Sequence, residues 1–291
     1  MSTFKYFLFA ALAALQSACV LNPKPLDIDI PEPPQRLVIS AFAIPPQELA
    51  ITLTRTFSAL LGEDSIDLDN PDVSGLVFVD SALVTLSYAG RTDTLQKLVP
   101  AVFGSITAEQ RLNERYFLKV KDFKTGLEIQ AETVLLPPVV LDTVYPVVSV
   151  LQGLDDTLHT FQYQFKDAPG TENYYVATYT NFNALSSQIL NPGKSLFNFN
   201  AQQFHVFSDK TTGDGQPITF KPDFDGARGD TLAVALSNIP KGYYEFLSAY
   251  KRSGNLFSQL IGEPINLPTN VEGGYGYFAM ILPKIKVVIL E

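Results

Sequence analysis

The chain has 291 residues, with 21 Lys and Arg against 30 Asp and Glu, so its formal net charge at pH 7 is −9. This acidic balance disfavours nucleic acid and anionic lipid headgroups as partners. The chain has one cysteine, which excludes a disulfide framework and a metal site built from several thiolates.

The first nineteen residues have the pattern of a secretory signal. Lys5 supplies a positive charge, residues 6–15 are apolar without interruption, and residues 16–18 are small or polar. Cys19 follows directly, as a lipoprotein signal peptidase requires, because its thiol accepts a diacylglyceryl group before the chain is cut in front of it. We therefore predict a signal peptide over residues 1–18 and a lipid anchor on Cys19.

Two other interpretations of this segment compete with lipidation. Plain secretion needs a small residue three positions before the cut, and Gln16 is poorly suited to that position. A membrane-spanning helix needs about 20 apolar residues, which is more than the run over residues 6–15 provides. Gln16 also departs from the usual lipoprotein pattern, which prefers an aliphatic residue there, while Leu15 lies one position too early.

Residues 19–35 are acidic and rich in proline, a composition that favours extended backbone and cannot form a core. We predict a tether. From residue 36, apolar residues alternate with polar ones, which is typical of strands. Strands are predicted at residues 37–41, 49–54, 82–88, 116–120 and 127–131, the last two forming a hairpin through Lys124-Thr125-Gly126. Residues 36–135 are thus predicted to be a small antiparallel, sandwich-like domain.

A second domain is predicted over residues 140–291, beyond the prolines at 137 and 138. The alternating segments 161–165 and 175–179 are predicted to form a hairpin through the turn Asp167–Gly170. Further strands are expected near residues 197–206 and 232–236, a helix over 241–257, and an edge strand within 279–290, where Pro283 interrupts the apolar run. The predicted fold class is all-β, with two sandwich-like antiparallel domains and a helical crossover in the second.

Three segments carry a resemblance to a known family. They are the alternation LDIDIPE at residues 26–32, KDAP at 166–169 with NYY at 173–175, and PTNVEGGYGYF at 268–278. Over nearly its whole length the chain resembles the Bacteroidota outer-membrane lipoproteins catalogued as domain of unknown function 4249. The resemblance implies an outer-membrane accessory lipoprotein of an uptake system, because such proteins are typically found beside TonB-dependent importers. It carries over no catalytic residue.

The sequence offers little material for catalysis. His159 and His205 each lie at or next to the start of a predicted strand, and neither has a second metal-ligand type at close spacing. No nucleophile elbow, phosphate-binding loop or dinucleotide fingerprint is present. We therefore predict a protein that is not an enzyme and has no cofactor, and we keep a hydrolase as the least favoured alternative.

Two acidic loops contain the oxygen ligands that calcium prefers. One holds Asp223, Asp225 and Asp230 around the flexible Gly226, and the other holds Asp64, Asp67, Asp69 and Asp72. Neither has the twelve-residue spacing with a terminal glutamate, since the twelfth position from Asp223 is Val234. Solvated acidic turns are therefore preferred over metal sites.

The tail motif has a structural and a functional interpretation. Its notable residues are Asn270, Gly273, Gly274, Tyr275, Gly276, Tyr277 and Phe278. The glycines permit positive φ and close backbone approach, which favours a turn laid across the aromatic core. Alternatively, the tyrosines present a contact face to a partner or glycan. Alternation places the tyrosines opposite Gly276 and Phe278, which favours the structural interpretation.

Taken together, these features predict a non-catalytic, lipid-anchored accessory protein that assists a TonB-dependent nutrient importer. The alternative is a surface adhesin or glycan-binding module that works alone. The two differ in whether an importer is found with the protein.

Overall fold

The computed structural model describes residues 34–44, 48–56, 71–150, 157–181, 204–211, 213–222, 224, 226–253 and 267–291. The chain divides into two units, Met1–Pro33 and Pro34–Glu291, and the described residues all belong to the second. The predicted signal peptide, Cys19 and most of the predicted tether lie outside the described residues. Among the described helices, none has the length and apolar character needed to cross a membrane.

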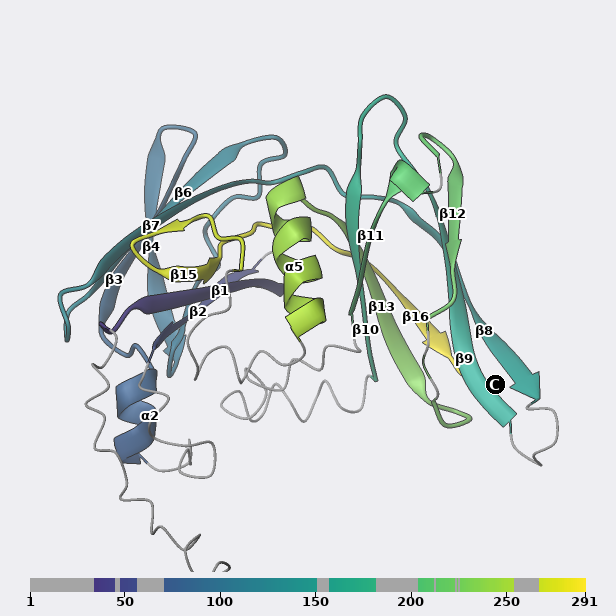
Figure 1. Ribbon diagram of the computed structural model, residues 1–291, viewed down its shortest axis with the longest axis horizontal. Coiled ribbons are helices and arrows are strands. Elements are labelled where there is room, and N and C mark those ends of the chain that lie inside the picture. The colour runs from purple at the N-terminus through teal and green to yellow at the C-terminus, as the bar shows by residue number, and fades with distance from the viewer. Residues whose placement is uncertain are drawn as a thin grey trace, which may run out of the picture. The chain divides into compact units, whose positions relative to one another are not determined.

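The largest sheet brings together strands from both ends of the described unit (Figure 1). Its strands are β1 (Leu37–Ile44), β2 (Glu48–Arg55), β3 (Ala82–Tyr88), β4 (Arg91–Val99), β5 (Val102–Ser105), β6 (Arg115–Asp122), β7 (Glu128–Val134), β14 (Val271–Glu272) and β15 (Tyr275–Tyr277). Their order is β14-β7-β6-β3-β4-β5-β2-β1-β15. The edge strands β14 and β15 are separated only by Gly273 and Gly274, so the sheet is nearly closed. All its strand pairs are antiparallel except β1 with β15.

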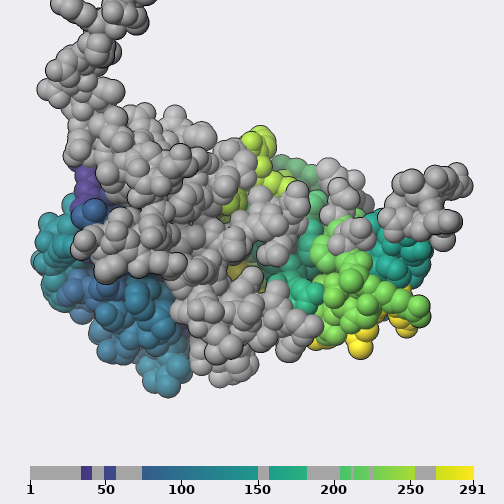
Figure 2. All heavy atoms as spheres, turned by 90° about the horizontal axis from the view of Figure 1, so that it is seen from below, coloured from purple at the N-terminus to yellow at the C-terminus, as the bar shows by residue number. Residues whose placement is uncertain are grey.

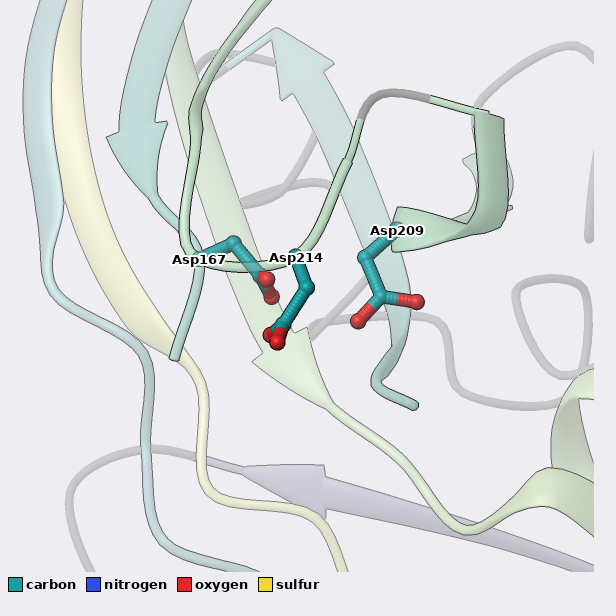
Figure 3. A group of neighbouring side chains, drawn as sticks. All are labelled: Asp167, Asp209 and Asp214. Carbon is teal, nitrogen blue, oxygen red and sulfur yellow. The ribbon is translucent and has the colours of Figure 1, made fainter. Parts of the chain in front are cut away.

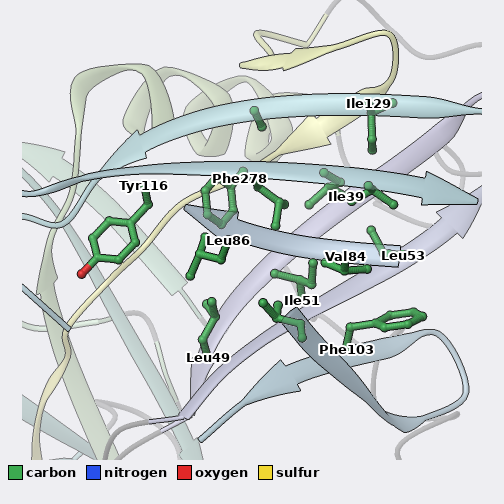
Figure 4. Close-up of a cluster of buried hydrophobic side chains, with 14 of the residues drawn as sticks. Ile39, Leu49, Ile51, Leu53, Val84, Leu86, Phe103, Tyr116, Ile129 and Phe278 are labelled. Carbon is green, nitrogen blue, oxygen red and sulfur yellow. The ribbon is translucent and has the colours of Figure 1, made fainter. Parts of the chain in front are cut away.

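One apolar cluster fills the inner face of this sheet (Figure 4). Along β6, exposed and buried residues alternate over the whole strand, as expected where one face meets a core. The same alternation buries Leu37 and Ile39 of β1 and Val84 and Leu86 of β3. The strands predicted within residues 36–135 are therefore present, but they lie in one nearly closed sheet rather than in two facing sheets.

A short helix, α2 (Pro71–Val77), lies where the sequence pattern indicated only a loop. Proline fits the first position of a helix, because the amide it lacks would have no partner there. The helix is about two turns long, which is too short for apolar periodicity to reveal it.

Two facing sheets form the second part of the described unit. The three-stranded sheet has the order β12-β9-β8, and the four-stranded sheet has the order β11-β10-β13-β16. Their strands are β8 (Leu141–Val150), β9 (Thr157–Lys166), β10 (Tyr174–Asn181), β11 (Phe204–Ser208), β12 (Pro217–Phe220), β13 (Thr231–Asn238) and β16 (Lys284–Ile289). An aromatic-rich core between the sheets draws side chains from both. The prediction of an all-β fold is confirmed.

The predicted hairpin between residues 161–165 and 175–179 is wrong. Both strands exist, but β9 pairs with β8 and β12, whereas β10 pairs with β11 and β13. The turn after β9 therefore carries the chain from one sheet to the other. Phe165 and Tyr175 meet edge-to-face across the core, with ring centroids 5.0 Å apart, and alternation alone does not distinguish this arrangement from strand pairing.

Helix α5 (Lys241–Ser253) covers the outer face of β10 and β11. Its buried residues Leu247 and Tyr250 pack with Val176 and Phe204 of the sheet. The helix begins at the predicted residue, while the predicted last turn over 254–257 lies outside the described residues. A single turn of 3-10 helix, η5 (Asp209–Thr211), follows β11.

Residues 267–291 join the apolar clusters of the described unit. Phe278 and Met280 belong to the core of the nine-stranded sheet, whereas Ile281 packs in the α5 cluster. Beyond Pro283, β16 forms the edge of the four-stranded sheet, as predicted, and Val288 enters the core between the two facing sheets. In the space-filling view the yellow surface of this last strand borders the green surface of the preceding elements (Figure 2).

A buried ion pair that the sequence analysis did not anticipate lies at the end of β6. Arg55 of β2 donates from Nε and Nη2 to the two carboxylate oxygens of Asp122, at 2.7 and 2.9 Å, and both side chains are at most 2% exposed. Arg55 Nη1 also donates to the Phe78 carbonyl at 2.6 Å. Asp122 in turn accepts from the Lys124 amide and the Thr125 hydroxyl, which fixes the turn of the predicted β6–β7 hairpin. Burial favours a raised pKa for Asp122, but the hydrogen bonds from Arg55, Thr125 and Lys124 outweigh it and lower the pKa below its ordinary value.

Replacing Asp122 with Asn should lower the free energy of unfolding by about 3–5 kcal/mol, because Arg55 would keep a buried charge without a counterion. Glu128→Gln is the matched control, since it breaks the exposed pair of Lys121 and Glu128 and should cost no more than about 1 kcal/mol. Chemical denaturation of both variants measures the difference. Equal losses would contradict the importance of the buried pair.

The same pair predicts a pH dependence. Because the pKa of Asp122 is lowered in the folded state, its stabilisation is fully present above the ordinary carboxyl value of 3.8 and is lost as the pH falls through the lower folded value. Thermal melts of the wild type and Asp122→Asn should therefore converge in strong acid. A constant gap between them down to the lowest pH would rule out this titration.

Candidate functional site

Side-chain hydrogen bonds hold the tail motif that contains β14 and β15. Asn270 donates from Nδ2 to the carbonyl oxygens of Glu132 and Phe278, each at 2.7 Å, and its Oδ1 accepts from the Phe278 amide at 2.9 Å. Thr269 Oγ1 donates to the Gly276 carbonyl at 2.7 Å. Asn270 therefore joins the two ends of the motif to each other and to β7.

The glycines of the motif lie where a side chain would not fit. Gly273 and Gly276 have φ angles of +82° and +90°, which L side chains rarely adopt. A Cβ atom on Gly274 would come within 2.6 Å of the Leu37 carbonyl oxygen, and one on Gly276 would overlap the Ile39 carbonyl. Close approach of β15 to β1 therefore requires glycine at these positions.

The two tyrosines of the motif make contacts within the chain. The Arg36 guanidinium lies over the Tyr275 ring, 5.5 Å from its centroid. Tyr277 packs against Tyr243 and Phe246 of α5, with ring centroids 5.2 and 5.5 Å apart, and burial raises the pKa of Tyr277. Both rings keep part of their surface exposed. The partner-contact interpretation of the motif stays a prediction.

Three carboxylates that are distant in sequence come together where β9 and β11 end (Figure 3). One oxygen from each of Asp167, Asp209 and Asp214 lies within 4.8 Å of the others. Asp167 and Asp209 are buried, and Asp214 is exposed. Asp167 accepts from the Tyr175 hydroxyl and from the Gly215 amide, the latter at 2.8 Å. The buried carboxylate thus fixes one strand and one loop at the same point.

The other two carboxylates hold the turn that follows β9. Asp214 accepts from the Gly170 amide at 2.8 and 3.0 Å, and Asp209 accepts from the Asn173 amide at 2.9 Å. The Asn173 side chain donates to the Ala168 carbonyl at 2.7 Å. Carboxylates in such a group suit a hard cation, but these oxygens accept protein hydrogen bonds, so the arrangement acts as a clamp between two loops. The sequence analysis marked Asp167 and Asn173 but not their partners.

Comparison with known families identifies the chain. A family model described as Domain of unknown function (DUF4249) matches residues 23–283. The chain belongs to the DUF4249 family. The match covers both the tail motif and the carboxylate clamp, and it confirms the predicted resemblance to domain of unknown function 4249. No curated protein matches the chain.

The two histidines of this DUF4249 chain lie in separate surroundings. His205 of β11 stacks on Phe220 and Phe207, with ring centroids 4.0 and 5.4 Å apart, and its Nδ1 has no hydrogen-bond partner in the described structure. Burial, aided by the charge of Lys251, lowers the pKa of His205 to about 4. His159 Nδ1 lies 2.5 Å from the Glu291 main-chain oxygen. His205 is therefore a neutral ring packed among aromatics at neutral pH.

The calcium hypotheses fall mostly on residues that the structure does not describe. Asp230 accepts from the Ala227 amide at 3.0 Å in the turn before β13. Outside the described residues lie Asp64, Asp67, Asp69, Asp223 and Asp225, and of Asp72 only the backbone is described. Calcium binding at either loop stays a prediction.

Replacing Gly276 with Ala should lower the free energy of unfolding by about 3 kcal/mol or more, because left-handed strain adds to overlap with the Ile39 carbonyl. Gly126→Ala is the matched control, since Gly126 has a φ of +73° but open space around it, so only the strain remains, at about 1 kcal/mol. Urea denaturation compares the two. Similar losses would show that close approach to β1 contributes nothing.

His205 should make the protein less stable as the pH falls from 6.5 towards about 4. Over that interval the unfolded chain binds a proton that the folded chain excludes, so protons favour unfolding. The melting temperature of the His205→Phe variant should fall less than that of the wild type between these pH values, because the variant has no imidazole to protonate. If the melting temperatures of the two proteins fell in parallel with pH, the lowered pKa of His205 would be refuted.

Proposed function

We propose that this DUF4249 protein is a lipid-anchored accessory protein of the outer membrane that assists a TonB-dependent nutrient importer by binding rather than by catalysis. The observation that carries the proposal is the arrangement of the N-terminal part. The second unit of the chain begins at Pro34. A short proline-rich segment separates it in sequence from Cys19, the residue predicted to be acylated. An acylated cysteine would hold such a unit on a membrane without a spanning helix.

The described polar groups support a binding role. The buried carboxylates Asp122, Asp167 and Asp209 are occupied by internal hydrogen bonds, and His205 is stacked among aromatic rings. A general acid or base needs a pKa close to the working pH and access to its substrate. The pKa of about 4 at His205 makes this ring a poor proton acceptor for such chemistry.

The association with an importer rests on the family. The resemblance noted in the sequence links these lipoproteins with TonB-dependent importers, and the acidic net charge disfavours a role on nucleic acid. The predicted extended, proline-rich tether would let the folded unit reach a neighbouring membrane protein while it stays attached.

Replacing Cys19 with Ala should move the protein from the membrane fraction to the soluble fraction, because the anchor and the folded unit are separate features. Ser17→Ala, which keeps Cys19, is the matched control and should stay in the membrane fraction. Fractionation followed by immunoblotting, with mass spectrometry of the N-terminal peptide, measures both. A Cys19→Ala protein that remains in the membrane would refute the lipid anchor.

Purification of the wild-type protein from native membranes in mild detergent should recover an outer-membrane importer. An unrelated lipoprotein, purified from the same membranes in the same detergent, serves as the control for nonspecific recovery. Recovery of the protein alone, without any importer, would contradict the accessory role.

A further inference from the structure

A groove of about 500 Å³ lies on the outer face of the nine-stranded sheet, over β3, β6, β7 and β14. Gly273 of the tail motif lines it, whereas the tyrosines of that motif and the three aspartates of the carboxylate clamp do not. Its polar side chains come from four strands and are Thr85, Lys119, Lys121, Glu128, Gln130 and Glu272. A volume of this size is in the range of small-molecule sites.

Strand register explains why these side chains gather on one face. Thr85, Lys119 and Gln130 are direct neighbours across β3, β6 and β7. Lys121 is paired with Glu128 in the same way. Glu272 of β14 continues the row beside Gln130, whose side-chain amide donates one hydrogen bond to the Glu272 carboxylate and leaves the other polar atoms of the two side chains to solvent. Neighbouring strands are about 4.8 Å apart, so the polar groups form a regular array along the groove.

The array combines hydrogen-bond donors and acceptors. Lysine only donates, a carboxylate only accepts, and Thr85 and Gln130 do both. Lys121 and Glu128 form an ion pair at 2.7 Å, but both side chains are more than half exposed, so their remaining hydrogen-bonding capacity faces solvent. A ligand that presents hydroxyl groups in close succession can satisfy donors and acceptors together, because each hydroxyl donates one hydrogen bond and accepts others.

Charge narrows the choice of ligand. Lys119 and Lys121 balance Glu128 and Glu272 within the groove. A polyanion would meet two carboxylates on a chain of net charge −9, and a polycation would meet the two lysines. A neutral ligand faces neither repulsion.

Two exposed apolar side chains complete the surface. Leu83 lines the groove and is 43% exposed. Phe117 does not line the groove but lies beside it, two residues from Lys119 on the same face of β6, with 44% of its surface exposed. An aromatic ring beside polar groups offers a flat apolar surface to the C–H face of a sugar ring. Peptides could use the same ring, but they bring fewer hydroxyl groups to the polar array.

We propose that this groove binds a neutral carbohydrate, with Lys119, Gln130 and Glu272 hydrogen-bonding its hydroxyl groups and Phe117 packing against a sugar ring. The inference goes beyond the accessory role, since carbohydrate binding does not require an importer. The two proposals therefore fail or succeed separately.

The full chain, purified in detergent, should bind neutral oligosaccharides on a glycan array that also carries acidic ones, and calorimetry should give the dissociation constant for the best neutral one. Lys119→Ala combined with Gln130→Ala should weaken binding at least about tenfold, because several hydrogen bonds are lost. Phe117→Ala should weaken it similarly. Arg115→Ala is the matched control, since Arg115 lies on the same face of β6, 71% exposed and outside the groove, and should leave the constant within about twofold.

Melting temperatures of all the variants should match that of the wild type, because the replaced side chains are exposed. Failure to bind any neutral glycan on the array would overturn the proposal. Binding confined to acidic glycans, or neutral binding that the groove variants leave unchanged, would overturn it as well.

Discussion

The close approach of β15 to β1 at Gly276 is the constraint on which the nine-stranded sheet depends. A sheet of this length has two edges with unpaired backbone groups, and such edges are prone to pair with other chains. Here the same short segment pairs with both edges, β14 with β7 and β15 with β1. Turning between them within two residues needs the glycines, and the Asn270 side chain holds the turn closed.

The segment that follows connects the nine-stranded sheet to the other apolar clusters. Phe278 and Met280 enter the core of the nine-stranded sheet, while Tyr277 and Ile281 pack with α5. The period of two that defines a strand thus divides one short stretch between two apolar clusters. The chain then continues into β16, which completes the four-stranded sheet. The groove proposed above lies on the outer face of the sheet that this segment closes.

Local patterns in the sequence predicted most of the elements but not their partners. Alternation located β1, β2, β3, β6, β7, β9, β10 and β13, because each has one face in a core. Helical spacing of apolar residues marked the start of α5. The pairing of β14 and β15 with strands about 140 and 240 residues earlier could not be read from any local window. Nor could the separation of β9 and β10 into facing sheets, because both arrangements bury the same alternating side chains.

In the candidate sites, too, single residues were predictable from the sequence and their distant partners were not. Asp167, Asn173 and the tail glycines were recognisable as special from the sequence, since turns and close approach favour these residue types. Their partners Asp209, Asp214 and Ile39 lie far away in the sequence and have no local signal. The buried pair of Arg55 and Asp122 is of the same kind, because a charged residue within a strand is ordinarily expected to face solvent.

Native-state hydrogen exchange of the tail segment tests most directly whether it closes the sheet. If β14 and β15 are integral to the sheet, the amides of β15 and of the adjacent strand β1 should exchange at similarly slow rates. Both sets of amides should become exposed in one cooperative opening. Fast exchange of residues 271–277 while β1 and β7 remain protected would show that the sheet is stable without the segment, and would contradict this account.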